Sequence, residues 1–274
     1  MSEPASTAPL FRRLVLGFHD ATCALPDLEA AIAFAQALES ELLGVFVEDS
    51  PALEWSSAPL SRHLARRSGA AVAVTPDRLT AELATSAATM RQRLMQAAAA
   101  HGVRAGFQVE RVSAAALQLA GAQAADLLAV LEPADPMARL SYPFAGILRA
   151  VAAGAAPVLY LPHGSRRRRG PVATLGPGPG PEGEGHRIAA AIAQRIGAPL
   201  ISLGERMKTG PEAPALSLPA LERALAGIDE SLLVLDRPAL PPPAAALLEE
   251  IAARRRVPLL VAGSADPDRP SGAT

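Results

Sequence analysis

The stretch Arg12-Arg13-Leu14-Val15-Leu16-Gly17, together with the two segments after it, decides the fold. Its apolar run over residues 14–17 is short and continuous, which is typical of a strand buried on both faces. Residues 26–38 then repeat apolar side chains at spacings of three and four and begin with proline, which predicts an amphipathic helix. Residues 42–47 predict a second buried strand. Strand, helix and strand in this order require a right-handed crossover and a parallel sheet.

The alternation of strand and helix continues along the chain. The other predicted strands cover residues 107–112, 127–131, 157–161, 172–175, 200–203, 232–235 and 258–262. The other predicted helices cover residues 76–100, 114–122, 144–153, 186–196, 219–226 and 244–255. Residues 49–75 break the pattern, and we expect them to be irregular with a short helix over 60–66. The whole pattern predicts an α/β fold with parallel strands and helices on both faces.

The second half of the chain repeats the first. Leu127-Leu128-Ala129-Val130-Leu131-Glu132-Pro133 corresponds to Leu232-Leu233-Val234-Leu235-Asp236-Arg237-Pro238. Ala156-Pro157-Val158-Leu159-Tyr160 corresponds to Val257-Pro258-Leu259-Leu260-Val261. Because a long internal repeat indicates a duplicated unit, we expect two α/β units related by a local twofold axis. The predicted boundaries are one unit at residues 12–162, an arginine-rich linker at 163–170, a shorter unit at 171–263 and a disordered tail at 264–274.

Two stretches resemble the universal stress protein family. One is the opening strand at residues 12–17, with its alanine-rich helix and then Leu42-Leu43-Gly44-Val45-Phe46-Val47-Glu48. The other is Ala125-Asp126-Leu127-Leu128-Ala129-Val130, with a loop and a helix after it and closed by Ala155-Ala156-Pro157-Val158-Leu159. The resemblance covers residues 12–162 directly and residues 171–262 through the internal repeat.

The resemblance implies two tandem open sheets, each of five parallel strands in the order 3-2-1-4-5 with flanking helices. This is the architecture called adenine-nucleotide alpha hydrolase-like. Members of the family commonly pair their fifth strands between subunits. Here residues 158–161 and 259–262 would be the two fifth strands, and pairing within one chain would hide two apolar sheet edges.

Composition excludes several classes of function. The formal net charge is -1, so the chain as a whole has no electrostatic reason to bind nucleic acid or an anionic membrane. One cysteine rules out an internal disulfide framework and fits a reducing compartment. The N-terminus does not resemble a secretory signal, and the apolar runs are too short to span a membrane. We therefore expect a cytoplasmic protein without membrane insertion.

The resemblance also implies where a nucleotide would bind. In ATP-binding members the pattern Gly-x2-Gly-x9-Gly-Ser/Thr comes after strand four, and its small residues let the backbone surround phosphates. The matching positions here are Glu132, Asp135, Ala145 and Gly146. The family's aspartate after strand one falls at His19, beside Asp20. Because carboxylates around the crevice would repel a polyphosphate, we expect no cofactor and no ATP binding in the family's manner, with ATP or AMP as the alternative ligand.

The second half offers two further positions to test. Gly178-Pro179-Gly180-Pro181-Glu182-Gly183 has the spacing of a dinucleotide loop, but its prolines remove N–H donors and its glutamate repels phosphate. We interpret it as a stiff connector. Asp236 and Ala239 stand where the glycine pair after strand four would begin. The nucleotide site of this half is therefore predicted to be lost as well.

Catalytic and metal-binding patterns are absent from the sequence. The five histidines have no metal-ligand spacing, so we expect no metal site and no enzymatic activity. Cys23 lies just before a predicted helix and near His19 in the sequence. A helix N-terminus lowers a thiol pKa, so a redox sensor is one hypothesis, and a small buried hydrophobic residue is the other.

The segment around Trp55 is the candidate partner surface. Trp55 is accompanied by Leu60 and Leu64 in a segment that only the first half has. An aromatic residue among leucines is typical of a protein interface, although packing of the loop on its own domain is the alternative. The resemblance and these features together predict a regulatory or scaffolding protein of a stress response that binds a protein partner or an unidentified small ligand, or that self-associates. The alternative function is a nucleotide-binding or slowly ATP-hydrolysing protein with a nonstandard site.

Overall fold

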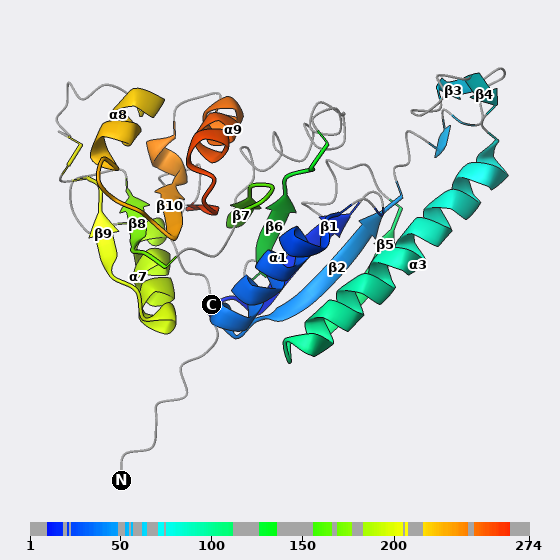
Figure 1. Cartoon of the computed structure of the whole chain (residues 1–274), viewed down its shortest axis with the longest axis horizontal. Coiled ribbons are helices and arrows are strands. Elements are labelled where there is room, and N and C mark those ends of the chain that lie inside the picture. Colours follow the sequence, from blue (N-terminus) through cyan, green and yellow to red (C-terminus); the bar gives the residue numbers. More distant parts are fainter. Residues whose placement is uncertain are drawn as a thin grey trace, which may run out of the picture.

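One sheet of nine strands organises the protein. The computed structural model describes residues 10–18, 21, 23–48, 53–54, 56, 62–64, 71–73, 75–111, 126–135, 156–165, 169–176, 183–204, 206–207, 216–240 and 244–263. The strand order is β5-β2-β1-β6-β7-β11-β10-β8-β9. Figure 1 shows the first-half strands, in blue and green, beside those of the second half, in yellow to red.

The first half contributes five strands and the second half four. The first five are β1 (Arg13–Phe18), β2 (Glu41–Val47), β5 (Ala105–Glu110), β6 (Asp126–Leu131) and β7 (Val158–Leu161). The other four are β8 (Val172–Leu175), β9 (Leu200–Ser202), β10 (Leu232–Asp236) and β11 (Leu259–Ala262). Outward from the centre of the sheet the order is β7, β6, β1, β2, β5 in the first half and β11, β10, β8, β9 in the other, so β10 takes the place of the first half's fourth strand and β11 that of its fifth. The two halves thus share one connectivity.

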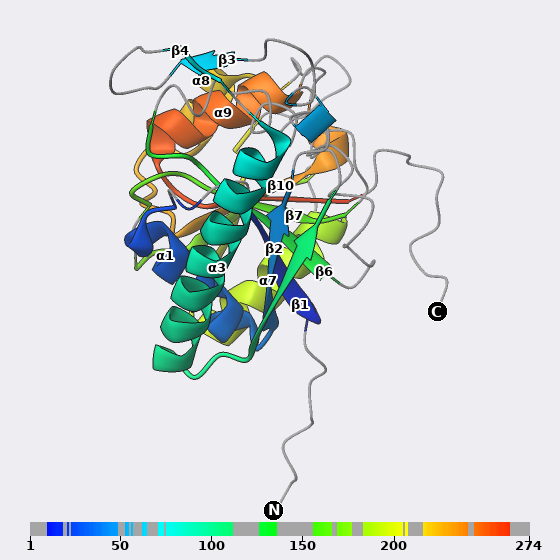
Figure 2. The same cartoon turned by 90° about the vertical axis from the view of Figure 1, so that its right-hand side faces the viewer.

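Five described helices flank the sheet. They are α1 (Leu25–Leu38), α3 (Pro76–Ala100), α7 (Glu184–Ile196), α8 (Leu218–Ala224) and α9 (Ala244–Arg255), with a short 3-10 turn, η1 (Arg237–Ala239). The predicted α1, α3 and α9 are confirmed almost residue for residue, because each begins or ends at a strong local signal such as Pro26 or Pro76. Figure 2 looks at the molecule from the side of α3, which crosses the front of the view.

Alternation along the strands divides the core into two layers. Leu14 and Leu16 of β1 pack in one buried cluster with α1, α3 and α7, whereas Val15 packs in a second cluster on the other face. In β10, Val234 belongs to the first cluster, and Leu235 belongs to the second with α8 and α9. Successive side chains of a strand point to opposite faces, so continuous apolar runs are what a sheet covered on both sides requires.

Two predictions about the sheet need correction. The resemblance implied two separate five-stranded sheets, but β7 pairs with β11 and makes one continuous sheet. The described residues of the second half supply four strands, as its local pattern predicted, and no counterpart of β5. The pairing itself was predicted, and it is confirmed: it is antiparallel, with Leu260 opposite Leu159. Strands that are apolar on both faces leave an unstable edge unless another strand covers it.

The helix predicted over residues 60–66 is wrong where the structure describes it. Residues Arg62–Leu64 form strand β3, which pairs antiparallel with β4 (Ala71–Ala73) in a separate two-stranded sheet. The partner strand β4 lies outside residues 60–66, so the spacing of apolar side chains within that stretch could not reveal the pairing. The predicted helices at 114–122 and 144–153, and the tail at 264–274, lie outside the described residues. The predicted unit boundaries stay a prediction.

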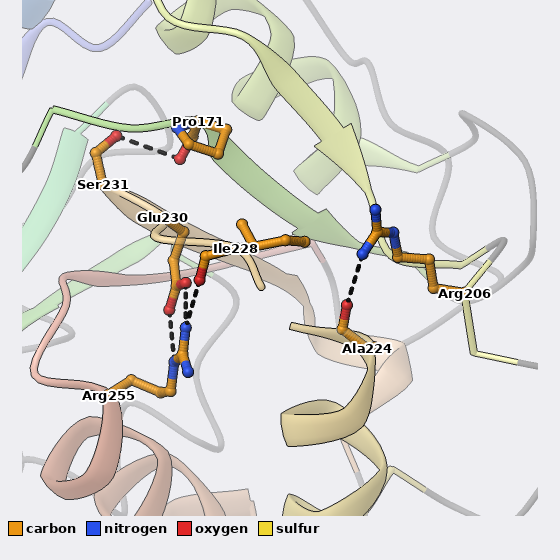
Figure 3. Close-up of polar contacts among 7 residues, drawn as sticks. All are labelled: Pro171, Arg206, Ala224, Ile228, Glu230, Ser231 and Arg255. Atoms are coloured by element: carbon orange, nitrogen blue, oxygen red, sulfur yellow. Dashed lines mark hydrogen bonds and ion pairs between the residues drawn. The ribbon is translucent and has the colours of Figure 1, made fainter. Parts of the chain in front are cut away.

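Buried carboxylates at the amino ends of both fourth strands are held by arginines. Asp126, fully buried at the start of β6, accepts hydrogen bonds from Nε and Nη2 of Arg13 at 3.1 and 2.6 Å. Glu230, fully buried just before β10, accepts two hydrogen bonds from Arg255 at the end of α9 (Figure 3). Arg255 also donates to the carbonyl oxygen of Ile228. Each carboxylate thus binds the start of its strand to another element, Asp126 to β1 and Glu230 to α9.

Arg237 ties the two halves together at one end of the central β7–β11 pair. Its side chain is buried, Nε donates to the carbonyl oxygen of Gly263 at 3.0 Å, and Nη2 donates to that of Ala156 at 2.9 Å. Gly263 comes directly after β11, and Ala156 lies two residues before β7. One guanidinium therefore joins the backbones on both sides of the junction.

We expect Arg237→Ala to lower the free energy of unfolding by about 3 kcal/mol, because it leaves two carbonyl oxygens at the junction without their donor. Urea denaturation monitored by circular dichroism measures the loss. Arg206→Ala is the matched control, since Arg206 donates one long bond of 3.4 Å to the carbonyl oxygen of Ala224 (Figure 3). Equal losses in the two variants would contradict a special role for Arg237.

Candidate functional site

The candidate sites lie at the carboxyl ends of the strands where the strand order reverses. In the first half the reversal falls between β1 and β6, and in the second half between β8 and β10. Crevices at such points are the usual ligand sites of open parallel sheets. Glu132 comes directly after β6, and Asp236 is the last residue of β10, so each half has a carboxylate at the carboxyl end of a strand beside its reversal point.

Few of the predicted site residues fall within the described part of the chain. Glu132 and Asp135 are described, and so is Leu64, as a backbone position in β3. Six others lie outside the described residues, namely His19, Asp20, Trp55, Leu60, Ala145 and Gly146. The described residues around the crevice are therefore those of the loops after β6 and β7 and of the first turn of α1.

Glu132 is bound to the loop after β7. Its backbone N–H donates to the carbonyl oxygen of Leu161 at 2.9 Å, which extends the β6–β7 pairing by one residue. Its Oε2 accepts a hydrogen bond of 2.9 Å from the backbone N–H of His163. The carboxylate thus binds a donor of the chain itself.

Asp27 binds the same loop from the other side of the crevice. It lies in the first turn of α1, is 5% exposed, and places Oδ2 2.7 Å from Nδ1 of His163. Its Oδ1 accepts a hydrogen bond of 3.0 Å from the backbone N–H of Gly164. Residues His163 and Gly164 are therefore joined both to α1, which comes after β1, and to Glu132, which comes after β6. The loop crosses the point where the strand order reverses.

Sequence reasoning missed Asp27 and placed His163 in the linker. Asp27 lies in the first turn of a predicted helix, where acidic residues are common, and this preference does not identify a hydrogen-bond partner. His163 is 136 positions further along the chain. Only the folded sheet brings β7 close enough to α1 for the two side chains to meet.

A further carboxylate approaches the first crevice from the second half. Partial burial, with the nearby Glu132 as the second cause, raises the pKa of Glu249 on α9. Helix α9 thus brings a second acidic group toward the loop after β6. A nucleotide polyphosphate at the carboxyl ends of β1 and β6 would meet this negative potential.

In the second half, Asp236 reaches the first turn of α7. Its side chain is 2% exposed, and Oδ1 accepts a hydrogen bond of 2.6 Å from the backbone N–H of Gly185. A Cβ atom at Gly185 would lie 2.6 Å from that oxygen, so only glycine leaves room for it. Oδ2 is buried and has no hydrogen-bond partner among the described residues. Sequence reasoning identified Asp236 as the residue replacing a glycine, but not this contact.

Burial raises the pKa of Asp236 above its ordinary value. The hydrogen bond from Gly185 opposes this shift, the nearby Glu184 adds to it, and His186 and Arg187 counteract it. The charged form is costly because one oxygen of the carboxylate is desolvated without a partner.

The described residues offer little for catalysis or metal binding. Within them, no group of three or more histidine, cysteine, aspartate or glutamate side chains could hold a metal ion. Cys23 is half-buried two residues before α1, and its thiol donates to the carbonyl oxygen of Ala24 at 3.6 Å. A small apolar pocket of about 40 Å³ lies between α1, through Ala30 and Phe34, and Ile196 at the end of α7. None of the described helices has the length and apolar character needed to cross a membrane.

Solved structures of similar fold include universal stress proteins. A universal stress protein from Archaeoglobus fulgidus matches 93% of this chain and 97% of its own, with a TM-score of 0.58 at 13% identity. A Pseudomonas aeruginosa protein of unknown function matches 93% of each chain, with a TM-score of 0.50 at 15% identity. A putative universal stress protein from the same species matches 93% of this chain and 94% of its own, with a TM-score of 0.47 at 16% identity.

The comparison with the Archaeoglobus protein confirms the α/β fold that the sequence predicted. It spans nearly the full length of both chains, so both halves take part in the likeness. No model of a known protein family matches this sequence. No curated protein matches it either.

We expect Asp236→Asn to remove a pH dependence of stability. Because the pKa of Asp236 is raised, the folded chain keeps a proton on this carboxyl at pH values where the unfolded chain has released it. The free energy of unfolding therefore falls as the pH rises from about 4 through the raised pKa. The asparagine variant should lack this fall. At pH values above the raised pKa it should be more stable than the wild type by about 1 kcal/mol.

Urea denaturation between pH 4 and pH 8 measures this effect. The control is Glu82→Gln, which removes an exposed carboxylate of α3 and should keep the wild-type pH profile. Parallel profiles for the wild type and Asp236→Asn would show that Asp236 is not the titrating group.

Proposed function

We propose that this protein is a universal-stress-protein-like regulatory or scaffolding protein that neither binds ATP in the family's manner nor catalyses a reaction. The proposal includes a role in a stress response and a cytoplasmic location. The observation that supports it is the network of Glu132, His163, Gly164 and Asp27, which fills the first crevice with the chain's own groups.

The network opposes a nucleotide in two ways. The N–H of Gly164 and the N–H of His163 donate to carboxylates of the chain, so two backbone donors beside the crevice are already used. The acceptors are themselves anionic, and Glu249 adds a further carboxylate from α9. A phosphate group would have to replace these bonds and overcome the repulsion.

A protein that keeps its buried core but has no open ligand crevice still has its surface for binding a partner. The segment that contains Trp55, Leu60 and Leu64 remains our candidate surface for a partner or for self-association. It belongs to the first half only, so it distinguishes the two otherwise similar halves. An aromatic anchor with apolar neighbours is the composition of a binding hot spot.

Calorimetry with ATP, ADP and AMP at physiological salt tests the nucleotide part of the proposal. We expect no dissociation constant below about 1 mM, which corresponds to about -4 kcal/mol. Micromolar binding by the wild type would contradict the proposal and favour a nucleotide-binding function.

The cause of weak binding can be tested in the same titration. The combined variant Glu132→Gly, Asp135→Gly and Ala145→Gly restores the family's pattern and should bind ATP more tightly, because it removes two carboxylates and the acceptor for His163. Glu82→Gln is the control, since it removes an exposed carboxylate of α3 that pairs with Arg78 and takes no part in the network. If the combined variant binds no better than this control, repulsion and lost donors are not the cause.

We expect Trp55→Ala to weaken self-association by about 1–3 kcal/mol and to leave the melting temperature unchanged. Sedimentation equilibrium and thermal denaturation of the same variant measure the two effects. Reduced thermal stability with unchanged association would instead show that Trp55 belongs to the core of its own domain.

A further inference from the structure

Strand β5 is a long outer edge of the nine-stranded sheet. Because β7 and β11 pair with each other, the two edges that remain among the described strands are β5 and β9 (Figure 1). Strand β9 has three residues, whereas all six residues of β5 lie in register with β2. The free side of an edge strand carries N–H and C=O groups that can pair with a strand of another chain, so proteins usually keep such edges short or charged.

The hydrogen bonds to β2 show which residues of β5 face outward. The carbonyl oxygens of Arg104 and Glu110, at the two ends of the strand, accept hydrogen bonds of 2.8 and 2.9 Å from the side of β2. The backbone polar groups of successive residues point to alternate sides of a strand. The N–H and C=O groups that point away from the sheet are therefore those of the odd-numbered residues, Ala105, Phe107 and Val109.

A second copy of β5 fits this edge in an antiparallel register centred on Phe107. Outward-facing residues then stand opposite outward-facing residues, with Phe107 opposite its own counterpart and Val109 opposite Ala105 of the partner subunit. Each of these pairs exchanges both N–H···O bonds. The side chain of Val109, which is 48% exposed, then gains an apolar neighbour across the strands.

The charges at the two ends of β5 are complementary in this register. Arg104 stands opposite Glu110 of the partner subunit, and the twofold axis repeats the pair at the other end. Both residues occupy non-hydrogen-bonded positions on one face, where opposite side chains come closest. The ion pair of Arg104 with Glu41 joins side chains that are 86% and 41% exposed, so it leaves the guanidinium accessible. Shifting the register by two residues in either direction places Glu110 opposite Gly106 or Gly102 instead.

We propose that β5 is a homodimerisation edge, at which two copies of this chain pair antiparallel about Phe107 and continue the sheet from one copy into the other. The partner is a second copy because an arginine at one end and a glutamate at the other are self-complementary about a twofold axis. This surface goes beyond the proposed function. It is separate in the sequence from the segment around Trp55, which the variants below leave unchanged.

Sedimentation equilibrium of charge-reversal variants tests the proposal. The wild type should dimerise, and added salt should weaken the dimer. Glu110→Arg places like charges opposite each other at both ends and should raise the dissociation constant about tenfold or more, and so should Arg104→Glu. The double variant restores opposite charges and should dimerise as the wild type does. Glu222→Arg, on α8 of the second half, is the control and should not change the dimer.

Removal of one outward N–H tests the backbone pairing. Val109→Pro removes a donor that is not bonded to β2, and proline is tolerated in edge strands for this reason. The variant should keep the circular dichroism of the wild type and lose most of its dimer. Val109→Thr is the matched control, because threonine keeps the N–H and favours strands.

Oxidative cross-linking tests the register. In a Cys23→Ser background, a mixture of Arg104→Cys and Glu110→Cys chains should form a disulfide-linked dimer faster than either variant alone. The two positions face each other in the proposed register at a Cα separation that a disulfide spans, whereas each is several residues away from its own counterpart.

Three outcomes would overturn the proposal. One is a wild type that stays monomeric at about 0.1 mM. Another is a dimer that Glu110→Arg and Val109→Pro leave unchanged, because such a dimer uses a different surface, and its loss in Trp55→Ala would assign it to that segment. The third is cross-linking of the mixture no faster than that of the single variants.

Discussion

The antiparallel pairing of β7 with β11 holds the two halves of this protein in one sheet. Each of these strands is buried on both faces and would otherwise be an exposed apolar edge. Their pairing satisfies the backbone of both strands and makes the two core layers continuous across the junction, with Leu159 and Leu260 in one layer and Val158 and Val261 in the other. Arg237 then binds carbonyl oxygens on both sides of the junction.

The same constraint brings functional groups together across the halves. Because β11 lies beside β7, helix α9 reaches the loop after β6, where Glu249 approaches Glu132. Helix α7 likewise contacts α1, and Arg195 donates to the carbonyl oxygen of Leu38 at the end of that helix at 2.9 Å. The first crevice is thus bordered by groups from both halves, although the strands around it belong to the first.

A carboxylate after the fourth strand has a different role in each half. Glu132 has a longer side chain and binds the backbone of the loop that crosses the crevice, whereas the shorter Asp236 binds the first turn of the helix beyond it. In both cases an acidic residue accepts hydrogen bonds from backbone N–H groups that could otherwise face a ligand. In each half a carboxylate at the carboxyl end of the sheet therefore binds an N–H group of the chain itself.

The sequence by itself determined the elements, because their signals are local: apolar runs for strands, three-and-four spacing for helices, and prolines at helix starts such as Pro76. It also located Glu132 and Asp236 at the ends of two apolar runs, because these runs can be recognised in the sequence. The pairing of β7 with β11 was expected from the family resemblance, but only the tertiary structure showed that β3 is a strand, because that depends on a partner strand outside the local pattern. The contacts of Asp27 with His163 and of Asp236 with Gly185 join positions 136 and 51 residues apart, and local patterns carry no information about such distances.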